Sequence, residues 1–433
     1  MQGGYKHDDR DGGVQEDPYD TDAQSVSLLA AFQARFTPPS HPPHPTDTGV
    51  LHSASFIASN AIDVHIPMLG IQSAARHLHA LMLQRPYSPA TWHSHELHPS
   101  LDDMGGREEN LVNFIFTMDL LNFSFWSNFD DGDPERWAVE YRSRRWTGYW
   151  GLVAALRRAI DEAEESGGVL ITDPVFWTSD ACTLEVVQHV FRSATSEPMP
   201  MLEQRWRCLR EAGEILGTHF SSSVSELLDT ASDSAVSLIN TLTSTFPCFN
   251  DTHTLDDQPV HFHKRAQIFA ADLWACFALY SESNYGKFED VDTITMFADY
   301  RIPQMLHTLG CLEYSPSLEA RIRRKEVLES GSQEEVEIRG SSIWAVECLR
   351  KEIVRLEDVR MAEIEAEHDG VETKARLQVN AILIDFFLYD LAKEMEALEK
   401  RKHENAHGEE QGLQAFEQTG GIIPHHRTRS IWY

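Results

Sequence analysis

Basic residues are scarce in this sequence. Its 433 residues include 37 Lys and Arg against 68 Asp and Glu, and the formal net charge is −31 at pH 7. A protein that binds nucleic acid gains most of its affinity by neutralising phosphates with Lys and Arg. We therefore expect no stable nucleic-acid complex and favour a small polar ligand, although a local basic pocket could still hold a single phosphate group.

The sequence also lacks the features of membrane and exported proteins. It contains no run of about 18 apolar residues, so no membrane span is expected. Its first residues, MQGGYKHDD, show neither a basic segment followed by an apolar one nor an Arg-rich amphipathic pattern, which argues against a secretory or transit peptide. The six cysteines form no C-x-x-C pair and indicate free thiols in a reducing compartment. We expect the cytoplasm, with the nucleus as the alternative.

Familiar catalytic signatures are absent as well. There is no G-x-S-x-G, no glycine-rich phosphate loop, no H-E-x-x-H and no G-x-G-x-x-G. The 21 histidines raise a metal hypothesis, and His93, His95 and His98 lie close enough in sequence to ligate one ion. No carboxylate or cysteine at a suitable spacing completes such a site, so His95 is better interpreted as a hydrogen-bonding group. Neither a metal nor another cofactor is expected.

What the sequence does contain is the pattern of a mainly α-helical protein. Apolar residues recur at intervals of three and four over residues 202–216, 264–280, 343–356 and 381–398. A small β-hairpin, over residues 137–141 and 145–150, is the most β structure that we expect. Residues 1–48, rich in Asp, Gly, Pro and His, predict a disordered tail. Residues 49–433 should form one large helical domain, with solvated charged insertions near 357–376 and 394–420.

One acid stands in an unusual apolar setting. Asp299 lies between Phe297 and Arg301 in the block 297–301 (Phe-Ala-Asp-Tyr-Arg), shortly before Pro303. Burial raises the pKa of a carboxyl group and a nearby arginine lowers it, so a tuned acid, base or charge stabiliser could sit here. On residue types alone, a helix cap or a buried ion pair is the simpler interpretation.

A second stretch, residues 113–126, combines polar and aromatic side chains. It places four Phe and a Trp beside Asp119, Asn122 and Ser124, a composition typical of a pocket that stacks a flat ring and hydrogen-bonds its edge. Core packing explains most of the aromatic residues. It explains Asp119 and Asn122 less well, because buried polar groups need partners.

Two charged pairs lie at positions where helices are expected. Lys264 and Arg265 open an amphipathic helix, although the helix dipole favours anions at that end. They either face a ligand phosphate together with free backbone N–H groups or lie on the surface. Asp385 and Asp390 interrupt an apolar helix and are separated by about 140° around its axis, so we do not expect them to point at the same spot. At least one should meet a cation, a ligand or a backbone cap.

Taken together, these stretches resemble one family, the queuosine salvage proteins, which are queuosine 5'-phosphate N-glycosylases. The matching blocks are residues 55–60, 122–127, 149–150 with the helix that follows, 264–268, 297–301, 335–340, 385–390 and 426–433. They follow the family's order over nearly all of residues 53–433, which is far more specific than any single motif. The long N-terminal tail and the two charged insertions depart from the family pattern.

The resemblance implies a helical fold similar to DNA glycosylases and hydrolysis of the bond between queuine and ribose 5-phosphate, which salvages queuine for tRNA modification. It also implies that Asp299 is the catalytic carboxylate and that His95, Phe297 and Asp390 line the base pocket. Breaking a ribosyl bond builds positive charge on the sugar, and a carboxylate beside the anomeric carbon stabilises or captures that cation.

The base imposes a further requirement. Queuine is a 7-deazaguanine in which a ring carbon replaces N7, so activation of the leaving group must come from elsewhere. We expect Asp390 or Asp385 to meet the guanine-like edge or the side-chain ammonium, and Phe297 with Phe125 or Trp126 to stack on the ring.

The phosphate needs a cation. Lys264, Arg265 or Arg301 would hold it, and its binding energy would position the ribose over the carboxylate. Tyr300 and Asn122 complete the expected substrate-binding residues.

Two other function classes remain as alternatives. A helical glycosylase acting on a polynucleotide would be compatible with the fold, but the net charge disfavours it. A non-catalytic nucleotide- or nucleobase-binding protein would keep the pocket without turnover, and an intact Asp299 argues against it.

Overall fold

The fold is mainly α-helical, as the sequence predicts. The computed structural model describes Met1 and residues 47–85, 87–129, 133–167, 170–367, 375–404 and 422–433. Residues 2–46 of the expected tail, and residues 368–374 and 405–420 of the expected insertions, lie outside the described residues. The α-helices are α2 (Val50–Asn60), α3 (Met68–Gln84), α4 (Glu108–Leu120), α5 (Gly148–Ser166), α6 (Pro174–Thr178), α7 (Leu184–Val190), α8 (Leu202–His219), α9 (Val224–Asp229), α10 (Ala235–Thr245), α11 (Lys264–Phe277), α12 (Arg301–Thr308), α13 (Pro316–Arg323), α14 (Gln333–Glu367) and α15 (Ala381–Glu404).

The four predicted helical patterns are confirmed, since three fall within α8, α14 and α15 and the fourth, 264–280, begins with α11 and extends three residues past its end. The expected insertion at residues 357–376 is not solvated at its first residue. Glu357 of α14 is buried, and its carboxylate accepts hydrogen bonds from Arg360 and from the backbone N–H of Leu377. A buried carboxylate requires such partners, and Glu357 therefore belongs to the packing of the helix.

Strands are few and short. The described residues contain three two-stranded antiparallel sheets, which pair β1 (Val64–His65) with β6 (Glu313–Tyr314), β2 (Val139–Tyr141) with β3 (Arg144–Trp146), and β4 (Thr252–Leu255) with β5 (Gln258–His261). The predicted hairpin is the β2–β3 pair, in which Val139 opposes Trp146. It is shorter than expected because Gly148 begins α5, so Tyr149 and Trp150 lie on a helix.

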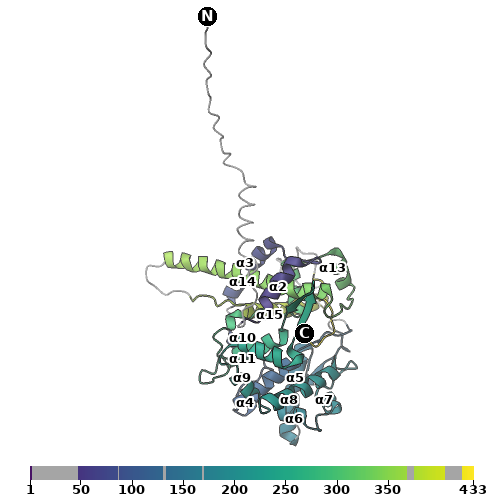
Figure 1. The fold of residues 1–433 in the computed structure, drawn as a ribbon. Helices are drawn as coiled ribbons and strands as arrows, with labels where there is room; N and C mark the ends of the chain where they lie inside the picture. Colours follow the sequence, from purple (N-terminus) through teal and green to yellow (C-terminus); the bar gives the residue numbers. More distant parts are fainter. Residues whose placement is uncertain (2–46, 86, 130–132, 168–169, 368–374, 405–421) are drawn as a thin grey trace. The chain divides into compact units, whose positions relative to one another are not determined.

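The helices form two groups that can be followed in Figure 1. In one group α14 packs against α2, α3, α12 and α15, and in the other α11 packs against α4, α10 and the short 3-10 helix η1 (Pro89–Ser94). Close approach of α14 to α2 depends on Gly340, where a Cβ atom would lie 2.4 Å from Cδ1 of Ile57. Residues from both groups line the large cavity described below.

The main apolar core lies in the α4–α11 group. Phe116 is completely buried at its centre, with ring contacts to Trp177, Phe246, Phe249 and Phe269. Burial of each such side chain contributes about 1.5–3 kcal/mol.

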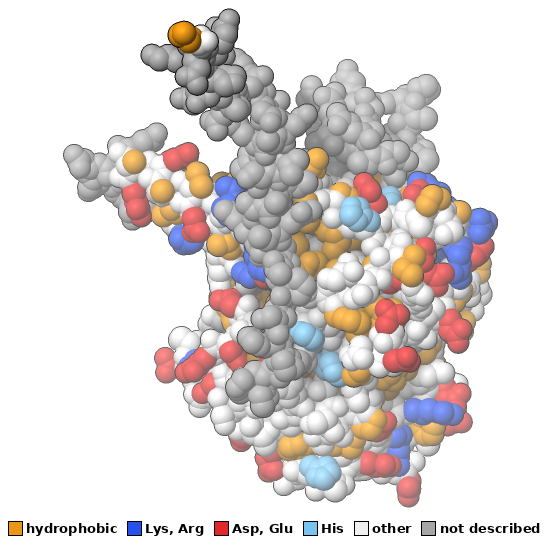
Figure 2. All heavy atoms as spheres, turned by 45° about the horizontal axis from the view of Figure 1, so that its top comes forward, with side chains coloured by type: hydrophobic (Ala, Val, Ile, Leu, Met, Phe, Trp, Pro, Cys, Tyr) orange, Lys and Arg blue, Asp and Glu red, His pale blue; other side chains and the backbone are white. Residues whose placement is uncertain are grey.

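On the face that Figure 2 shows, Lys and Arg side chains are interspersed with Asp and Glu. Among the described residues no helix is long and apolar enough to cross a membrane.

Candidate active site

A cavity of about 990 Å³ lies at the meeting point of the two helix groups. Its lining comes from the region of η1, the end of α4, Arg136, the β3–α5 junction, α11, the segment that leads into α12, α15 and the C-terminal Tyr433. All the predicted site residues line it, namely Asp299, His95, Phe297, Asp390, Asp385, Tyr300, Arg301, Lys264 and Asn122.

One wall of the cavity is built from stacked rings. His95 stacks on Trp150 with 3.2 Å between ring centroids and 9° between planes, and His98 stacks on Trp92 at 3.8 Å. Burial lowers the pKa of His95 to about 4, so this ring is neutral at pH 7. Its Nδ1 accepts the backbone N–H of Leu97 at 3.2 Å, which leaves Nε2 as the protonated nitrogen of the neutral ring.

Asp299 is both a helix cap and a cavity residue. Its Oδ1 accepts the first two backbone N–H groups of α12, from Arg301 at 2.8 Å and Ile302 at 2.9 Å. Burial raises the pKa of its carboxyl group, and the charge of Lys264 opposes that rise. Asp299 is thus a helix cap, as its residue type suggested. The capping hydrogen bonds hold its carboxylate at the cavity.

Lys264 and Arg265, the first two residues of α11, donate hydrogen bonds to carbonyl groups at the end of another helix. The last carbonyl groups of a helix lack intrahelical partners, and here α4 ends against the start of α11. Arg265 donates to the carbonyl oxygens of Leu120 and Cys248, while Nζ of Lys264 lies 3.1 Å from the carbonyl oxygen of Asn122. This explains two buried cations at a helix N-terminus.

The same contacts correct one expectation. Arg265 does not line the cavity and its guanidinium is used by backbone carbonyls, so it is not a phosphate ligand. Both Lys264 and Arg265 are buried, which also excludes a surface role. Lys264 does line the cavity, and burial lowers its pKa to about 8, so it still carries its charge at neutral pH.

Arg301 lines the cavity, but its guanidinium already forms an ion pair within the protein. Its guanidinium pairs with Glu396 of α15 and donates to Gln304 at 3.4 Å. Other lining cations were not predicted: Arg136, Arg145 and Lys393. Arg145 lies in the β2–β3 hairpin and the partly buried Arg136 lies just before it, where the residue pattern indicates only a strand.

The two acids of α15 line the same cavity but meet different groups. Asp385 accepts the backbone N–H of Phe297 at 2.9 Å, whereas Asp390 accepts a hydrogen bond from the hydroxyl group of Tyr87. The two side chains therefore do not point at the same spot, as their separation around the helix axis predicts. Burial raises the pKa of both carboxyl groups, and for Asp385 the nearby charge of Asp299 raises it further.

One buried acid of the cavity, Asp272, was not predicted. Asp272 of α11 lines the cavity, and Asp119 of α4 lies behind it, completely buried. Burial raises the pKa of Asp272 to about 7, and burial together with the charge of Asp272 raises that of Asp119 well above its usual value. The sequence signal existed, since Asp272 is an acid in an apolar helix just as Asp385 is.

The aromatic stretch 113–126 divides between core and cavity. Phe123, Phe125 and Asn122 line the cavity. Trp126 does not, because its ring packs under the Arg429 guanidinium and its indole N–H donates to the carbonyl of Thr428. The expectation that Trp126 could stack on a ligand ring is therefore wrong.

Aromatic and phenolic groups of three other segments also line the cavity without having been predicted: Tyr149 and Trp150 of α5, Tyr389 of α15, and Tyr433. Burial raises the pKa of Tyr300, a predicted residue, to about 12, so its hydroxyl group is a hydrogen-bond donor at neutral pH.

The three histidines of the metal hypothesis have other partners. His93 Nε2 lies 2.6 Å from the carbonyl oxygen of Cys276, and His98 bridges the carbonyl of Trp92 and the hydroxyl of Tyr149. No group of three or more His, Cys, Asp or Glu side chains in the described part of the chain is arranged to hold a metal ion.

Comparison with known proteins gives a consistent result. The family model described as queuosine salvage protein matches residues 97–433. A protein of Nematostella vectensis named queuosine 5'-phosphate N-glycosylase/hydrolase is 37% identical over 381 residues, which cover 88% of this chain and 97% of the relative. Proteins of the same name are 38% identical in Schizosaccharomyces pombe, over 89% of this chain and 99% of the relative, and 36% identical in Mus musculus, over 88% and 97%.

Proposed function

This chain belongs to the queuosine salvage protein family, and we propose on that basis that it hydrolyses the N-glycosidic bond of queuosine 5'-phosphate. Water adds across the bond between the base and C1' of the ribose. The oxygen of water goes to C1', the base nitrogen receives a proton, and queuine and ribose 5-phosphate are released. The observation that carries this proposal is a family match that includes a capped, cavity-lining carboxylate at Asp299.

Asp299 acts on the ribosyl cation. As the bond to the base breaks, positive charge develops at C1' and the ring oxygen, and a carboxylate held in a low-dielectric cavity stabilises it strongly. Two backbone hydrogen bonds fix the carboxylate, and Lys264 favours its ionised form. A carboxylate oxygen of Asp299 that faces C1' could also bond to it and form a ribosyl ester. Stabilisation of the cation and covalent capture therefore require the same placement of the carboxylate.

Asp385 and the rings hold the base. Phe297 and the stacked pair of His95 and Trp150 offer flat surfaces to a deazaguanine ring. Asp385 is assigned to the base edge because it is hydrogen-bonded to Phe297, which brings the edge-binding and ring-binding groups together. Burial raises the pKa of Asp385 and so favours its protonated form, whose proton would be available to a leaving base that has no N7. Asp390, which is exposed and accepts a hydrogen bond from Tyr87, is assigned to the side chain of the base.

Lys264 binds the 5'-phosphate, with Arg301 as a second cation. Arg301 is in direct contact with the carboxylate of Glu396, whereas the hydrogen bonds of Lys264 Nζ are to the neutral backbone and side chain of Asn122 and Asp299 acts on it only through its charge. Lys264 is therefore the stronger electrostatic partner for a dianion.

We place the activity in the cytoplasm. All six cysteines are free and buried, which suits a reducing compartment.

The direct test is release of free queuine from queuosine 5'-phosphate by the purified protein, followed by chromatography. Wild-type protein should release base, and Asp299→Asn should reduce kcat by at least about 100-fold, because the amide keeps an oxygen for the two backbone N–H groups but carries no charge. Absence of release by the wild type would refute the activity. Turnover by Asp299→Asn at the wild-type rate would refute only the role of Asp299.

A further inference from the structure

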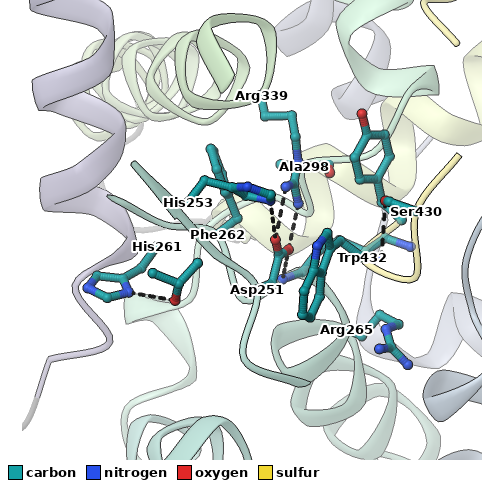
Figure 3. A network of polar contacts seen from close by, with 12 residues as sticks. Asp251, His253, His261, Phe262, Arg265, Ala298, Arg339, Ser430 and Trp432 are labelled. Carbon is teal, nitrogen blue, oxygen red and sulfur yellow. Dashed lines mark hydrogen bonds and ion pairs between the residues drawn. The ribbon is translucent and has the colours of Figure 1, made fainter. Parts of the chain in front are cut away.

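A fully buried arginine joins two parts of the active site from behind. Arg339 of α14 donates from Nη1 and Nη2 to the two carboxylate oxygens of Asp251, at 2.9 and 2.6 Å, and from Nε to the carbonyl oxygen of Ala298 at 3.2 Å. Figure 3 shows Ala298 and Asp251 on either side of the Arg339 guanidinium. Neither Arg339 nor Asp251 lines the cavity.

Each end of this bridge leads directly to a cavity residue. Ala298 immediately precedes Asp299 in the chain. Asp251 accepts the backbone N–H of Lys264 at 3.3 Å, and its backbone carbonyl accepts the N–H of Phe262 at 3.0 Å. The residue between them, His263, has a left-handed backbone with φ of 48°, a conformation that needs support from its surroundings. The bridge therefore connects the backbone of Asp299 with the backbone that carries Lys264.

The Arg339 guanidinium is packed between two aromatic rings. It lies over the ring of Phe262 at 4.0 Å and over that of Tyr433 at 4.4 Å, and its side chain has no exposed surface. Burial disfavours the ionised form of Asp251, but the charge of Arg339 outweighs it and lowers the pKa of Asp251. A buried ion pair adds little net stability by itself. One that also holds a backbone group on each side fixes the distance between those groups.

We propose that Arg339 and Asp251 are positioning residues for the hydrolysis, and that they set the placement of the Asp299 carboxylate relative to the Lys264 ammonium. This inference rests on the proposed function. Neither residue touches the substrate. Their effect passes through the Ala298 carbonyl on one side and the Lys264 N–H on the other.

The test compares Arg339→Lys and Asp251→Asn with wild type. A lysine keeps the charge but cannot donate to both oxygens of Asp251 and to the Ala298 carbonyl in the same geometry. Asp251→Asn keeps an acceptor for the Lys264 N–H but removes the charge. The matched control is Arg157→Lys, which alters another buried arginine paired with an aspartate, Asp103 at 3.0 Å, in residues that do not line the cavity.

Both positioning variants should lower kcat by about 10- to 100-fold with little change in KM, because misplacement by about 1 Å is enough for such a loss. The acid limb of the pH profile of kcat/KM should also move to higher pH, because displacement of the Lys264 ammonium from Asp299 weakens the interaction that favours ionisation of Asp299. The charged and titratable groups that face Asp299 are Lys264, Arg301, Asp385, Tyr300 and Tyr389, and none is altered in these variants.

A purely structural role gives a different result. Loss of folded protein lowers the rate by the same factor at every pH, so a fall in kcat with an unmoved acid limb would overturn the proposal. Unfolding of both variants while Arg157→Lys remains folded would assign the pair to core stability and overturn it as well. Inactivity of the wild type would instead refute the proposed function, so the two failures are distinct.

Discussion

The carboxylate of Asp385 accepts the backbone N–H of Phe297 at 2.9 Å, two residues before Asp299. The two acids are close enough for the charge of Asp299 to raise the pKa of Asp385, and burial raises it more. Burial also raises the pKa of Asp299, but two backbone donors and the charge of Lys264 oppose that rise, whereas Asp385 has one backbone donor besides Lys264. Unlike environments separate the pKa values of neighbouring acids and so assign their roles. We therefore propose Asp299 as the carboxylate of the pair and Asp385 as the carboxylic acid.

The acid role of Asp385 predicts the behaviour of Asp385→Asn. The amide oxygen can still accept the Phe297 N–H, so folding and KM should change little. Because the amide cannot transfer a proton, kcat should fall by about 100-fold or more, and the basic limb of its pH profile should disappear. Steady-state kinetics between pH 5 and 9 would check this, with Asp390→Asn as the comparison on the same helix. A wild-type kcat in Asp385→Asn would exclude proton donation by this residue.

Lys264 controls the ionisation of Asp299. Burial raises the pKa of Asp299 and Lys264 lowers it, so Lys264→Met should raise that pKa and move the acid limb of kcat/KM upward. Activity at pH 5–6 should fall more than activity at pH 8. Lys264→Arg keeps the charge and should restore most of the low-pH activity. An acid limb at the same pH in Lys264→Met would contradict the coupling.

The phosphate role of Lys264 requires a separate measurement. If Lys264 binds the phosphate, Lys264→Met should raise KM for queuosine 5'-phosphate by roughly 10-fold or more, as expected for loss of a charged hydrogen bond. It should raise KM for the nucleoside queuosine much less. A preference for nucleotide over nucleoside equal to that of the wild type would remove Lys264 from the phosphate site without affecting the previous prediction.

Arg265 should matter for stability rather than for binding. Arg265→Met leaves the carbonyls of Leu120 and Cys248 without their buried donor. An unsatisfied buried group costs about 1–3 kcal/mol, so the free energy of unfolding in urea should fall by about 2–5 kcal/mol. The nucleotide-over-nucleoside preference of the folded protein should stay unchanged. A selective loss of nucleotide binding would reverse our correction of its role.

Asp272 makes stability depend on pH in a defined direction. Its pKa is raised to about 7 in the folded state, with burial as the main cause, while an exposed Asp titrates near 4. The folded state therefore retains a proton that the unfolded state has lost, and this contribution disappears as the pH rises through about 7. Asp272→Asn should flatten the fall in Tm between pH 5.5 and 8. Thermal unfolding at both pH values would check it, and parallel curves for variant and wild type would count against it.

The sequence predicted the cavity residues better than it predicted their partners. Asp299, Lys264 and Asp385 could be found because charged residues in apolar segments need an explanation. The partners are mostly backbone groups, such as the carbonyls at the end of α4 that receive Lys264 and Arg265. No pattern of residue types shows that the C-terminus of one helix will meet the N-terminus of another.

Some features were not predicted because local residue patterns favour another structure or are too short to show one. Tyr149 and Trp150 were assigned to a strand because aromatic residues favour strands, but Gly148 has a φ of 62° and begins a helix there. The resulting turn of α5 brings Trp150 against His95. Likewise, two of the three small sheets of the described residues depend on contacts that are either distant in sequence, as between β1 and β6, or too short to leave an alternating pattern, as in β4 and β5.

The lining of the cavity extends along the chain from Tyr87 to Tyr433. Contacts between residues so far apart in sequence form late in folding, since the entropy of closing the intervening loops must be overcome first. The main apolar core includes Ile382 of α15, so α15 must pack on this core before Asp385 reaches the cavity. During refolding from denaturant, helical circular dichroism should therefore recover before catalysis, and base release should follow the slowest kinetic phase.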